Sequence, residues 1–536
     1  MRFVDRLRGH WATLTVIALS VVVHLWELGR RPLAHDEAID AWFSWQARGT
    51  GVIKYDPVYH GPLRFYLEGF VLDHVGITPG WARLVAVLAG IAMTIMIARS
   101  KRLLGRFGAP FAALLFTISP TVLTVTRTGR EDSLTGLVSL ALLLVVANAL
   151  IELRPRHIVG AGALLALSFS LKETTFIFGF AAVCFAIGLA SVALVRPSGR
   201  ARVFVTAVRR AGSLPWMWST VAFIAIVGVV FTSAFRYQDG FASGLLDGIK
   251  YWLGQHRVGR GSQHWFFYAT IYAGYEWLIL GVVAIGLAAT LHRRSMVGAW
   301  FATMAVVQFA VYSWAGEKFA WLALHPLIPA ILLAGLGSQA VYDALGRRAL
   351  RLSSPRSRWL PSALVGTTAV LAVLTAMAAV RPAITHGADP RELLVTVQTS
   401  TRVPELTDQF ATARRQGTLG SILIDERDGG SWPWAWYLHG FDDIGYQTID
   451  PTQALPAGFD AYVVSASTDP PPVPDGYVIE RFPLRGWWLP DYDHVTITKA
   501  LRWLATRNTW SPTASSDQYL IVKASAGVEV QADAAG

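Results

Sequence analysis

The stretch SLTGLVSLALLLVVANALI, residues 133–151, contains no charged side chain and decides the fold class. A helix needs about 20 consecutive apolar residues to cross the hydrocarbon core of a membrane, so these residues predict a membrane-spanning helix. Charged sequence borders the stretch on both sides, with RTGRED at 127–132 and ELRPR at 152–156. Both ends of the predicted helix therefore have the polarity expected at a membrane surface.

Ten further apolar stretches lie between residues 1 and 380, which predicts a polytopic α-helical membrane protein with about eleven spans. These stretches are residues 11–28, 81–98, 108–126, 158–172, 174–195, 216–234, 271–291, 296–313, 319–341 and 360–380. The whole chain is 53% hydrophobic and 15% charged, whereas a soluble globular protein has about 25% charged residues. The single cysteine, Cys184, excludes a disulfide framework and a cysteine-based metal cluster.

The distribution of charge predicts the orientation of the spans. Residues 1–380 carry a net charge of +18 and residues 381–536 a net charge of −7, which together give the +11 of the chain. If the N-terminus is cytoplasmic, every cytoplasmic loop is basic, as the positive-inside rule requires. Because the basic excess belongs to the membrane part, we expect no nucleic-acid partner. We expect a multi-pass protein of the cell membrane, in contact with membrane lipid, with a cytoplasmic N-terminus.

Composition divides the chain into a membrane domain at 1–380, a small α/β domain at 381–523 and a disordered tail at 524–536. In the long first outer loop, two amphipathic stretches at 37–48 and 63–74 predict helices that lie along the membrane interface. The second domain alternates helix-like and strand-like runs and follows an odd number of spans, so we expect it on the extracytoplasmic side. Its predicted strands are 421–425, 461–464 and 477–480, and its predicted helix is 390–415.

The first outer loop offers two candidate chemical groups. Asp36 and Glu37 follow the first span, where a carboxylate close to the membrane can deprotonate an incoming hydroxyl or hold a divalent metal. The alternative is the first turn of a helix, with Asp36 as its N-cap. His60 stands in the turn YHGPL at 59–63 and can donate to a phosphate or move a proton, unless the turn only opens a helix.

Two charged clusters follow the first loop. In RTGRED, Arg130 suits a phosphate through bidentate hydrogen bonds, and Asp132 stands beside it. The alternative for this segment is an ordinary loop with local ion pairs. Lys172 and Glu173 lie between two apolar stretches, where ionisable residues suggest a functional site. Here the alternative is that the two charges neutralise each other at a turn.

Two further candidates come from the second half of the membrane domain. The loop KYWLGQHRVGR at 250–260 places His256, Arg257 and Arg260 among aromatic residues, which suits a phosphate beside a sugar or a lipid tail. An aromatic interfacial belt is the alternative, but it does not account for these three cations. Lys318 stands at the start of a span at the outer surface and is a further candidate cation. The alternative is that its side chain only extends along the apolar surface to bring the amine to water. The clusters together suit a phosphorylated lipid bound at one outer membrane surface.

These motifs together resemble the GT-C superfamily of polyprenyl-phosphate-sugar-dependent glycosyltransferases, which includes protein O-mannosyltransferases and bacterial lipid A aminoarabinose transferases. The resemblance lies in the order of the acidic pair, the turn HGPL, the cluster RTGRED, Lys172, the basic loop and the segment EKFAWLALHP at 317–326. The strings YDPVYHGPL, KYWLGQHRVGR and WPWAWYLHG are similar to the GT-C-like branch called flippase activity-associated. One difference is that this chain has HGP where the mannosyltransferases have His-Pro-Pro.

The resemblance implies a GT-C fold and an inverting transfer of one sugar from a polyprenyl phosphate to a hydroxyl of a protein, glycan or lipid on the extracytoplasmic face. It implies that Asp36 is the base toward the acceptor, with Glu37 as its neighbour or substitute. The predicted substrate-binding residues are His60, Arg130, Asp132, Lys172, Glu173, His256, Arg257, Arg260 and Lys318. We expect no cofactor, and the alternative is a divalent metal near the carboxylates. A second alternative is a non-enzymatic protein that handles lipid-linked sugars, such as a flippase or its partner.

Overall fold

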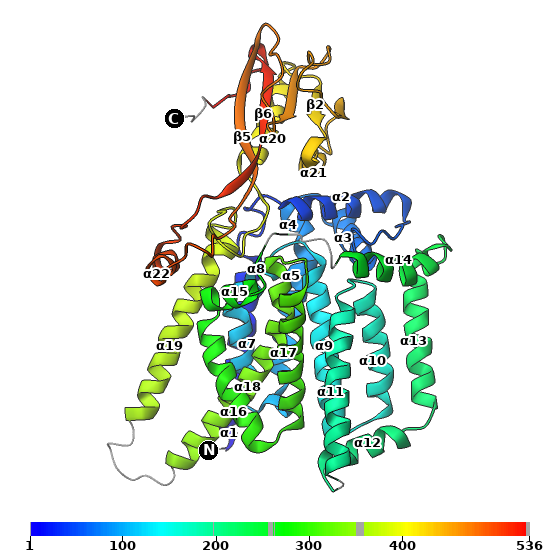
Figure 1. Cartoon of the computed structure of the whole chain (residues 1–536), viewed down its shortest axis with the longest axis vertical. Helices are drawn as coiled ribbons and strands as arrows, with labels where there is room; N and C mark the ends of the chain where they lie inside the picture. Colours follow the sequence, from blue (N-terminus) through cyan, green and yellow to red (C-terminus); the bar gives the residue numbers. More distant parts are fainter. Residues whose placement is uncertain (1, 197, 256–260, 262, 350–358, 532–536) are drawn as a thin grey trace. The chain divides into compact units, whose positions relative to one another are not determined.

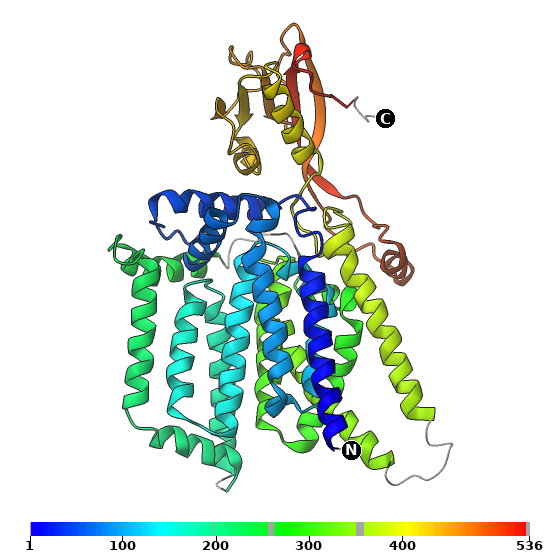
Figure 2. The same ribbon diagram turned by 180° about the vertical axis from the view of Figure 1, so that it is seen from behind.

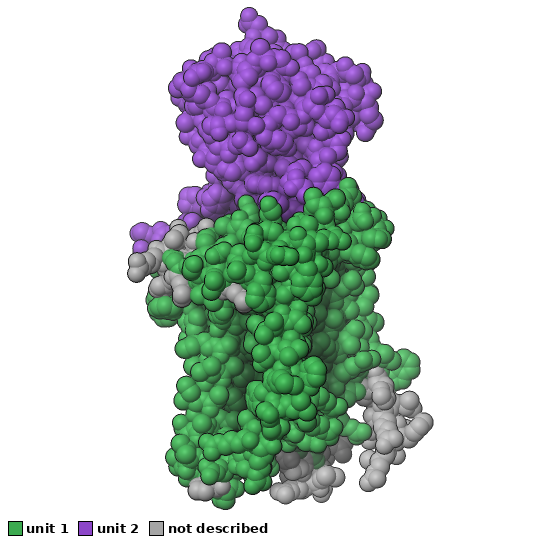
Figure 3. All heavy atoms as spheres, turned by 90° about the vertical axis from the view of Figure 1, so that its right-hand side faces the viewer, with its two compact units in different colours: residues 1–28, 47–76, 82–385 green, residues 29–46, 77–81, 386–536 purple. Residues whose placement is uncertain are grey.

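The structure, a computed structural model, describes residues 2–196, 198–255, 261, 263–349 and 359–531. The chain forms two compact units, which Figure 3 distinguishes by colour. The membrane unit comprises Met1–Leu28, Ala47–Gly76 and Ala82–Thr385, and the sheet unit comprises Gly29–Gln46, Ile77–Trp81 and His386–Gly536. Two short segments of the first loop therefore group with the C-terminal residues, whereas the sequence analysis assigns all of residues 1–380 to one domain.

The membrane unit is built from helices, and each apolar stretch predicted from the sequence overlaps at least one of them (Figures 1 and 2). These are α1 (Arg2–Leu25), α3 (Leu63–His74), α5 (Leu84–Arg99), α6 (Lys101–Leu104), α7 (Gly108–Ile118), α8 (Pro120–Thr126), α9 (Glu131–Ile151), α10 (Pro155–Phe169), α11 (Thr175–Val195), α12 (Arg200–Arg210), α13 (Leu214–Phe231), α14 (Gly240–Gln255), α15 (Phe267–Tyr275), α16 (Trp277–Arg293), α17 (Met296–Trp314), η1 (Ala320–Ala323), α18 (Leu324–Ala349), α19 (Trp359–Val380) and η3 (Arg381–Thr385). Helices α2 (His35–Thr50) and α4 (Pro79–Ala82) each contain residues of both units.

Among the described residues, six helices are long and apolar enough to cross a membrane, or eight if each of two bent pairs is one span. The pair α7–α8 bends by 66° and the pair α15–α16 by 105°. The breaks support each other, because Glu276 between α15 and α16 accepts hydrogen bonds from Ser119 Oγ at 2.8 Å and Thr121 N at 2.9 Å. A carboxylate at the N-terminus of α8 stabilises its unpaired N–H groups. The count of eleven spans stays a prediction.

The loops that the sequence places on the cytoplasmic side contact one another at one end of the membrane unit. Arg102 pairs with Glu152 at 3.3 Å, which joins the α5–α7 connection to the α9–α10 loop. Arg293 at the end of α16 pairs with Asp343 of α18 at 3.4 Å, and Gln339 of α18 accepts from the backbone of residues 107 and 108. Helix α12 lies at this end and α14 at the opposite end (Figure 1). Which end faces the cytoplasm stays a prediction.

Arg127 fastens the end of the first helix to the end of the last. Its guanidinium donates to the carbonyl oxygens of Val23, His24, Trp26 and Ala383 at 2.7–3.0 Å. The last carbonyls of a helix have no partner within the helix, so a buried arginine is an efficient way to satisfy them. The arginine is 4% exposed. One residue of the RTGRED cluster is thus structural.

The sheet unit contains a six-stranded mixed sheet with the strand order β1-β5-β6-β4-β2-β3. Its elements after residue 386 are β1 (Gln398–Thr399), α20 (Arg402–Arg415), β2 (Ile422–Asp425), η4 (Arg427–Gly429), α21 (Trp434–Tyr437), β3 (Ile444–Gln447), β4 (Ala461–Ser465), β5 (Tyr477–Trp487), α22 (Ile497–Thr506), β6 (Ala514–Lys523) and η5 (Ala524–Ala526). Strand β2 pairs in parallel with β3 and β4, and β6 pairs antiparallel with β4 and β5. The three strands predicted from the sequence are confirmed as β2, β4 and the beginning of β5.

Alternating side chains give the sheet two buried faces. Ile422 and Ile424 of β2 pack with Phe410 of α20, while Leu423 packs with Tyr462 on the other face. This alternation follows from the period of two residues in a strand. A strand that is covered on both faces reads as a continuous apolar run, as residues 422–424 do.

The helix predicted at 390–415 begins only at Arg402. Residues before it cannot be helical, because Val397 has a φ of 51° and Gln398 pairs with Gly486 of β5. At the other end of the domain, residues 524–531 make hydrogen bonds to the rest of the sheet unit. The sequence analysis assigns these residues to the disordered tail. The main chain of residue 529, for example, accepts from Arg402. Residues 532–536 lie outside the described residues.

The buried pair of Arg402 and Glu480 allows a test of this packing. The guanidinium donates to the two carboxylate oxygens at 2.8 and 2.7 Å, and the side chains are 7% and 2% exposed. Arg402→Ala leaves the carboxylate buried without its partner, so we expect the free energy of opening of the sheet to fall by about 3–5 kcal/mol. Hydrogen exchange of the β5 amides in the full chain measures this quantity.

The matched control is Arg415→Ala, which removes an exposed arginine from the same helix and should change the opening free energy by less than about 0.5 kcal/mol. Equal exchange rates in the two variants would show that the ion pair does not hold the sheet domain together.

Candidate functional site

Glu131 and Asp132 form the first turn of α9, and both side chains are buried. Carboxylates are favoured there because the N-terminus of a helix carries a partial positive charge. The ammonium of Lys172, from the loop between α10 and α11, donates to Glu131 Oε1 at 2.7 Å and to Asp132 Oδ1 at 2.8 Å. The lysine is itself 3% exposed. Three charged groups from two distant segments therefore share a site that water barely reaches, and we call this the ion cluster.

Two further cationic or ionisable side chains complete the ion cluster. Arg130 contacts Glu131 Oε1 through Nη2 at 3.1 Å, and its guanidinium stacks 4.3 Å from the ring centre of Trp321. His325 of α18 contacts Asp132 Oδ1 through Nε2 at 3.1 Å. An arginine on an aromatic face keeps its charge while its edge remains able to donate. The ion cluster thereby connects α9 to α18.

His60 joins the ion cluster to the first loop. Its Nδ1 lies 2.8 Å from Glu173 Oε2 and its Nε2 lies 3.5 Å from Glu131 Oε1. Tyr55 donates to the other oxygen of Glu173 at 2.7 Å. The imidazole thus stands between two carboxylates, and Glu173 is held by two partners from the same loop.

Gly61 explains why the turn HGPL fits at this place. Its N–H donates to Leu171 O at 3.1 Å, and a Cβ at this position would lie 2.2 Å from Ser170 O. Only glycine allows such a close approach of two backbones. The preceding His60 has a φ of 66°, in the left-handed region. The turn is therefore locked against the segment that carries Lys172 and Glu173.

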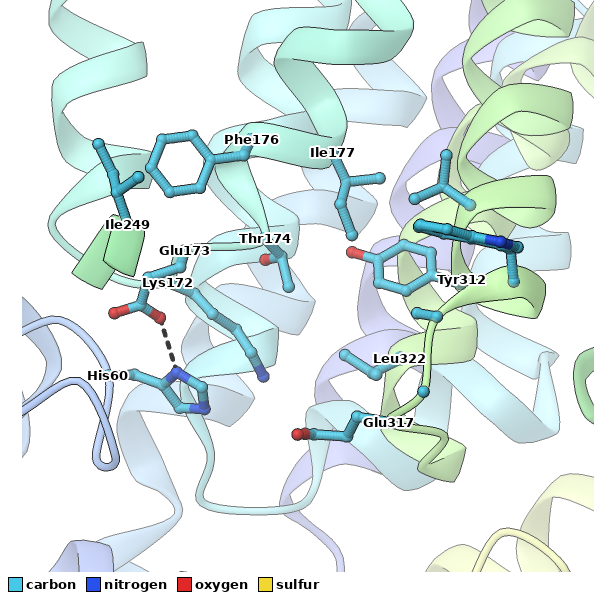
Figure 4. A pocket seen from close by; sticks show the side chains of 14 residues that line it. His60, Lys172, Glu173, Thr174, Phe176, Ile177, Ile249, Tyr312, Glu317 and Leu322 are labelled. Atoms are coloured by element: carbon cyan, nitrogen blue, oxygen red, sulfur yellow. Dashed lines mark hydrogen bonds and ion pairs between the residues drawn. The ribbon is translucent and has the colours of Figure 1, made fainter. Parts of the chain in front are cut away.

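A cavity of about 680 Å³ opens beside the ion cluster, between α11 and α17 (Figure 4). Lys172, His60 and Glu173 lie on one side of it, and Tyr312, Leu322 and Glu317 lie across from them. The rest of its lining is mostly apolar and comprises Phe176, Ile177, Ile249, Val311 and Trp314 among others. The cavity can therefore accept a ligand that has a charged head and an apolar tail.

Lys318 lies next to this cavity but does not line it. Its ammonium donates to the backbone oxygen of Ala315, and burial lowers its pKa from the ordinary value. The predicted residues His256, Arg257 and Arg260 lie outside the described residues. Gly261, which follows them, lies against the backbone of Lys318, because a Cβ there would be 2.6 Å from Lys318 O.

Asp36 and Glu37 belong to the sheet unit, at the beginning of α2. Glu37 is 1% exposed, accepts from Ala34 N at 2.8 Å and pairs with Arg31 at 3.2 Å. Asp36 is half-buried, and its charge acts on the guanidinium of Arg485, whose pKa is lowered by burial. Glu37 therefore stabilises the entry of the chain into α2, while Asp36 keeps a more accessible carboxylate.

The structure brings together five of the predicted residues: His60, Arg130, Asp132, Lys172 and Glu173. Glu131 and His325 belong to the same cluster, although the prediction of substrate-binding residues omitted them. Glu131 could have been included because it adjoins Asp132, whereas nothing near His325 in the sequence reveals its partner. Among the described residues, no group of three or more histidine, cysteine or acidic side chains is arranged to hold a metal ion.

The α3 helix contributes a second pair that the sequence analysis did not select. Arg64 and Glu68 are each 2% exposed and lie 3.7 Å apart, one turn from each other. The charge of Arg64 acts on Glu131. Charges at positions i and i+4 on the inner face of an amphipathic helix are the signal that could have found them.

Comparison with known proteins places this geometry in context. Residues 59–231 match the family model described as dolichyl-phosphate-mannose-protein mannosyltransferase, a range that includes His60, Glu173 and every residue of the ion cluster except His325. Among curated proteins, none matches the chain.

Solved structures share the fold over most of the chain. ArnT from Cupriavidus metallidurans, bound to undecaprenyl phosphate, has a TM-score of 0.54 at 15% identity, with 81% of this chain and 85% of that chain covered. The Archaeoglobus fulgidus oligosaccharyltransferase has a TM-score of 0.54 at 12% identity, with 83% and 64% covered. These similarities and the family match confirm the resemblance to the GT-C superfamily, so the chain has the GT-C fold, with a helical membrane part and a C-terminal sheet domain.

Proposed function

We propose that the chain is a membrane glycosyltransferase that transfers a sugar from a polyprenyl-phosphate donor to a hydroxyl acceptor on the extracytoplasmic face, with inversion at the sugar carbon. The family match to a mannosyltransferase model supports the reaction class. The ArnT structure contains undecaprenyl phosphate, and the archaeal oligosaccharyltransferase has been solved with a dolichol-phosphate, which supports a lipid-linked donor.

The observation that carries the proposal is the cavity with a charged side and an apolar remainder. An ammonium has three N–H donors, and Lys172 uses two of them on Glu131 and Asp132. The third can bind a phosphate oxygen, because the lysine lines the cavity. The apolar lining from α11 and α17 suits the first isoprenoid units of a lipid.

Charge balance indicates where further cations are needed. Within the ion cluster, Lys172 and Arg130 are matched by Glu131 and Asp132, and Glu173 adds a further negative charge. A phosphate therefore needs positive charge from outside this set. The basic loop supplies it in the proposal through Arg257 and Arg260, on the basis of the sequence alone, with Lys318 beside the cavity.

The proposed reaction needs a base but no acid. The acceptor oxygen attacks the anomeric carbon, the bond from that carbon to the phosphate oxygen breaks, and its electron pair stays on the phosphate. The hydroxyl proton goes to a carboxylate, and we assign this role to Asp36. Glu37 is already committed to Arg31 and to the backbone of Ala34, which favours Asp36 of the two. Cations stabilise the leaving phosphate as its charge develops.

A flippase would need a polar path across the bilayer. In the described residues, the polar side chains of the cavity are His60, Lys172, Glu173, Thr174, Tyr312 and Glu317, and the remaining side chains of its lining are apolar. The charged residues of the cavity lie together beside the ion cluster, where they can bind a phosphate group. The lining therefore favours binding of a lipid phosphate over transport of that phosphate across the bilayer.

The first test measures lipid phosphate binding. We expect Lys172→Met and the double variant Arg257→Gln, Arg260→Gln each to weaken binding of undecaprenyl phosphate to the full chain by about 10- to 100-fold, since each loses a charge-assisted hydrogen bond. Native mass spectrometry or microscale thermophoresis in detergent measures the affinity.

Two controls make this result specific. Lys101→Met removes a lysine from the predicted cytoplasmic loops and should leave the affinity unchanged. Because Lys172→Met leaves two carboxylates without their partner, its thermal stability is measured in parallel. The loop double variant replaces no residue of the ion cluster, so unchanged affinity in that variant would contradict the proposed phosphate site.

The second test concerns the base. We expect Asp36→Asn to lower the rate of sugar transfer by about 10²- to 10⁴-fold, the usual contribution of a general base, while undecaprenyl phosphate still binds. Glu37→Gln should instead lower thermal stability, because it weakens the contacts to Arg31 and Ala34. Transfer assays with polyprenyl-phosphate mannose and other lipid-linked sugars measure the rate. Persistent transfer by the double variant Asp36→Asn, Glu37→Gln would remove both residues from catalysis.

A further inference from the structure

The segment between β5 and β6 carries a helix that leaves part of its surface uncovered. Residues 488–513 connect the two strands and contain α22. Trp488, Trp503 and Trp510 pack together with ring centres 4.6–6.3 Å apart. Trp503 from α22 is 3% exposed. The tryptophan cluster gives the helix a fixed orientation in the sheet unit.

The exposed surface of α22 is divided into an apolar strip and a basic strip. Residues at i, i+4 and i+8 lie on one side of a helix, so Ile497, Leu501 and Ala505 form a continuous apolar strip. Ile497 is 82% exposed and Leu501 59% exposed. Arg502 is also exposed and borders this strip, and Lys499 is exposed on the far side of Arg502, so that the two cations form the basic strip. The third side of the helix, which includes Trp503, is buried.

Hydrogen bonds fasten α22 to the chain just beyond the last membrane span. Trp503 Nε1 donates to Arg391 O at 3.1 Å, and Arg507 pairs with Glu392 at 3.2 Å through buried side chains. The last apolar span ends at Thr385. An extended chain covers at most about 3.6 Å per residue, so the six residues from Thr385 to Arg391 reach about 20 Å. The covalent chain therefore limits the distance between the end of the last span and Arg391, to which α22 is hydrogen-bonded, to about 20 Å.

We propose that α22 lies in the membrane interface, with its apolar strip among the lipid acyl chains and its basic strip at the lipid phosphates. An amphipathic helix with exposed aliphatic residues and flanking lysine or arginine is the form that interfacial helices take. The lipid bilayer is the occupant that the observations favour, because the strip is narrow, bordered by the exposed cation Arg502 and tied to a membrane span. The sheet unit would then have an attachment to the membrane in addition to its covalent links to the membrane unit.

The proposal is tested on the full chain with site-directed spin labels. In a Cys184→Ala background, single cysteines replace Ile497 and Leu501, and the labelled chain is reconstituted in vesicles of phosphatidylcholine and phosphatidylglycerol. Both positions are exposed, so the labels leave the tryptophan cluster intact. The matched controls are Lys499→Cys on the basic strip and Asp469→Cys, an exposed position in the loop after β4.

Collision with oxygen, which concentrates in lipid, and with a water-soluble nickel chelate reports the depth of each label. We expect the ratio of oxygen to nickel collisions at residues 497 and 501 to exceed that at residue 469 several-fold, with residue 499 between them. Equal ratios at residues 497, 501 and 469 would overturn the proposal. So would labels that neither reagent reaches, or dipolar coupling between labels of two chains, because these results indicate a protein partner or a second copy on the strip.

Discussion

The ammonium of Lys172 between the carboxylates of Glu131 and Asp132 is the interaction on which the membrane unit depends around the candidate site. Removing three charges from water costs several kcal/mol per ion, and only short contacts with further hydrogen bonds offset that cost. Arg130 and His325 supply those contacts. The ion cluster therefore ties the start of α9, the α10–α11 loop and α18 into one arrangement, and removing Lys172 would take one cationic partner from each of two buried carboxylates.

The position of the cavity walls follows from the packing of the first loop against the α10–α11 loop. The backbone of Gly61 lies directly against Ser170, so the first loop cannot move away from the segment that carries Lys172. With that segment held, α11 leaves it as one wall of the cavity, and α17 forms the opposite wall (Figure 4). A charged boundary beside apolar walls thus results from close backbone packing and ion pairing.

The fold class was accessible from the sequence because apolar runs and strand alternation are local signals. Long-range contacts could not be predicted from the sequence, as three examples show. The bend at Glu276 depends on a carboxylate that caps α8, more than 150 residues away, and the late start of α20 depends on the pairing of Gln398 with β5. In the candidate site, the charged motifs were visible one by one, but the contact of His325 with Asp132 joins residues on two helices and has no sequence periodicity.

The charged residues in and near the ion cluster have two different roles. Arg127, Arg130 and Glu131 are engaged with backbone or with one another, which makes them parts of the framework. Lys172 belongs to the framework through two of its three donors and also lines the cavity. Because the framework charges nearly cancel, they cannot by themselves attract an anion from the lipid phase. The phosphate recognition proposed above therefore draws on cations outside the ion cluster, namely Lys318 beside the cavity and, from the sequence alone, Arg257 and Arg260.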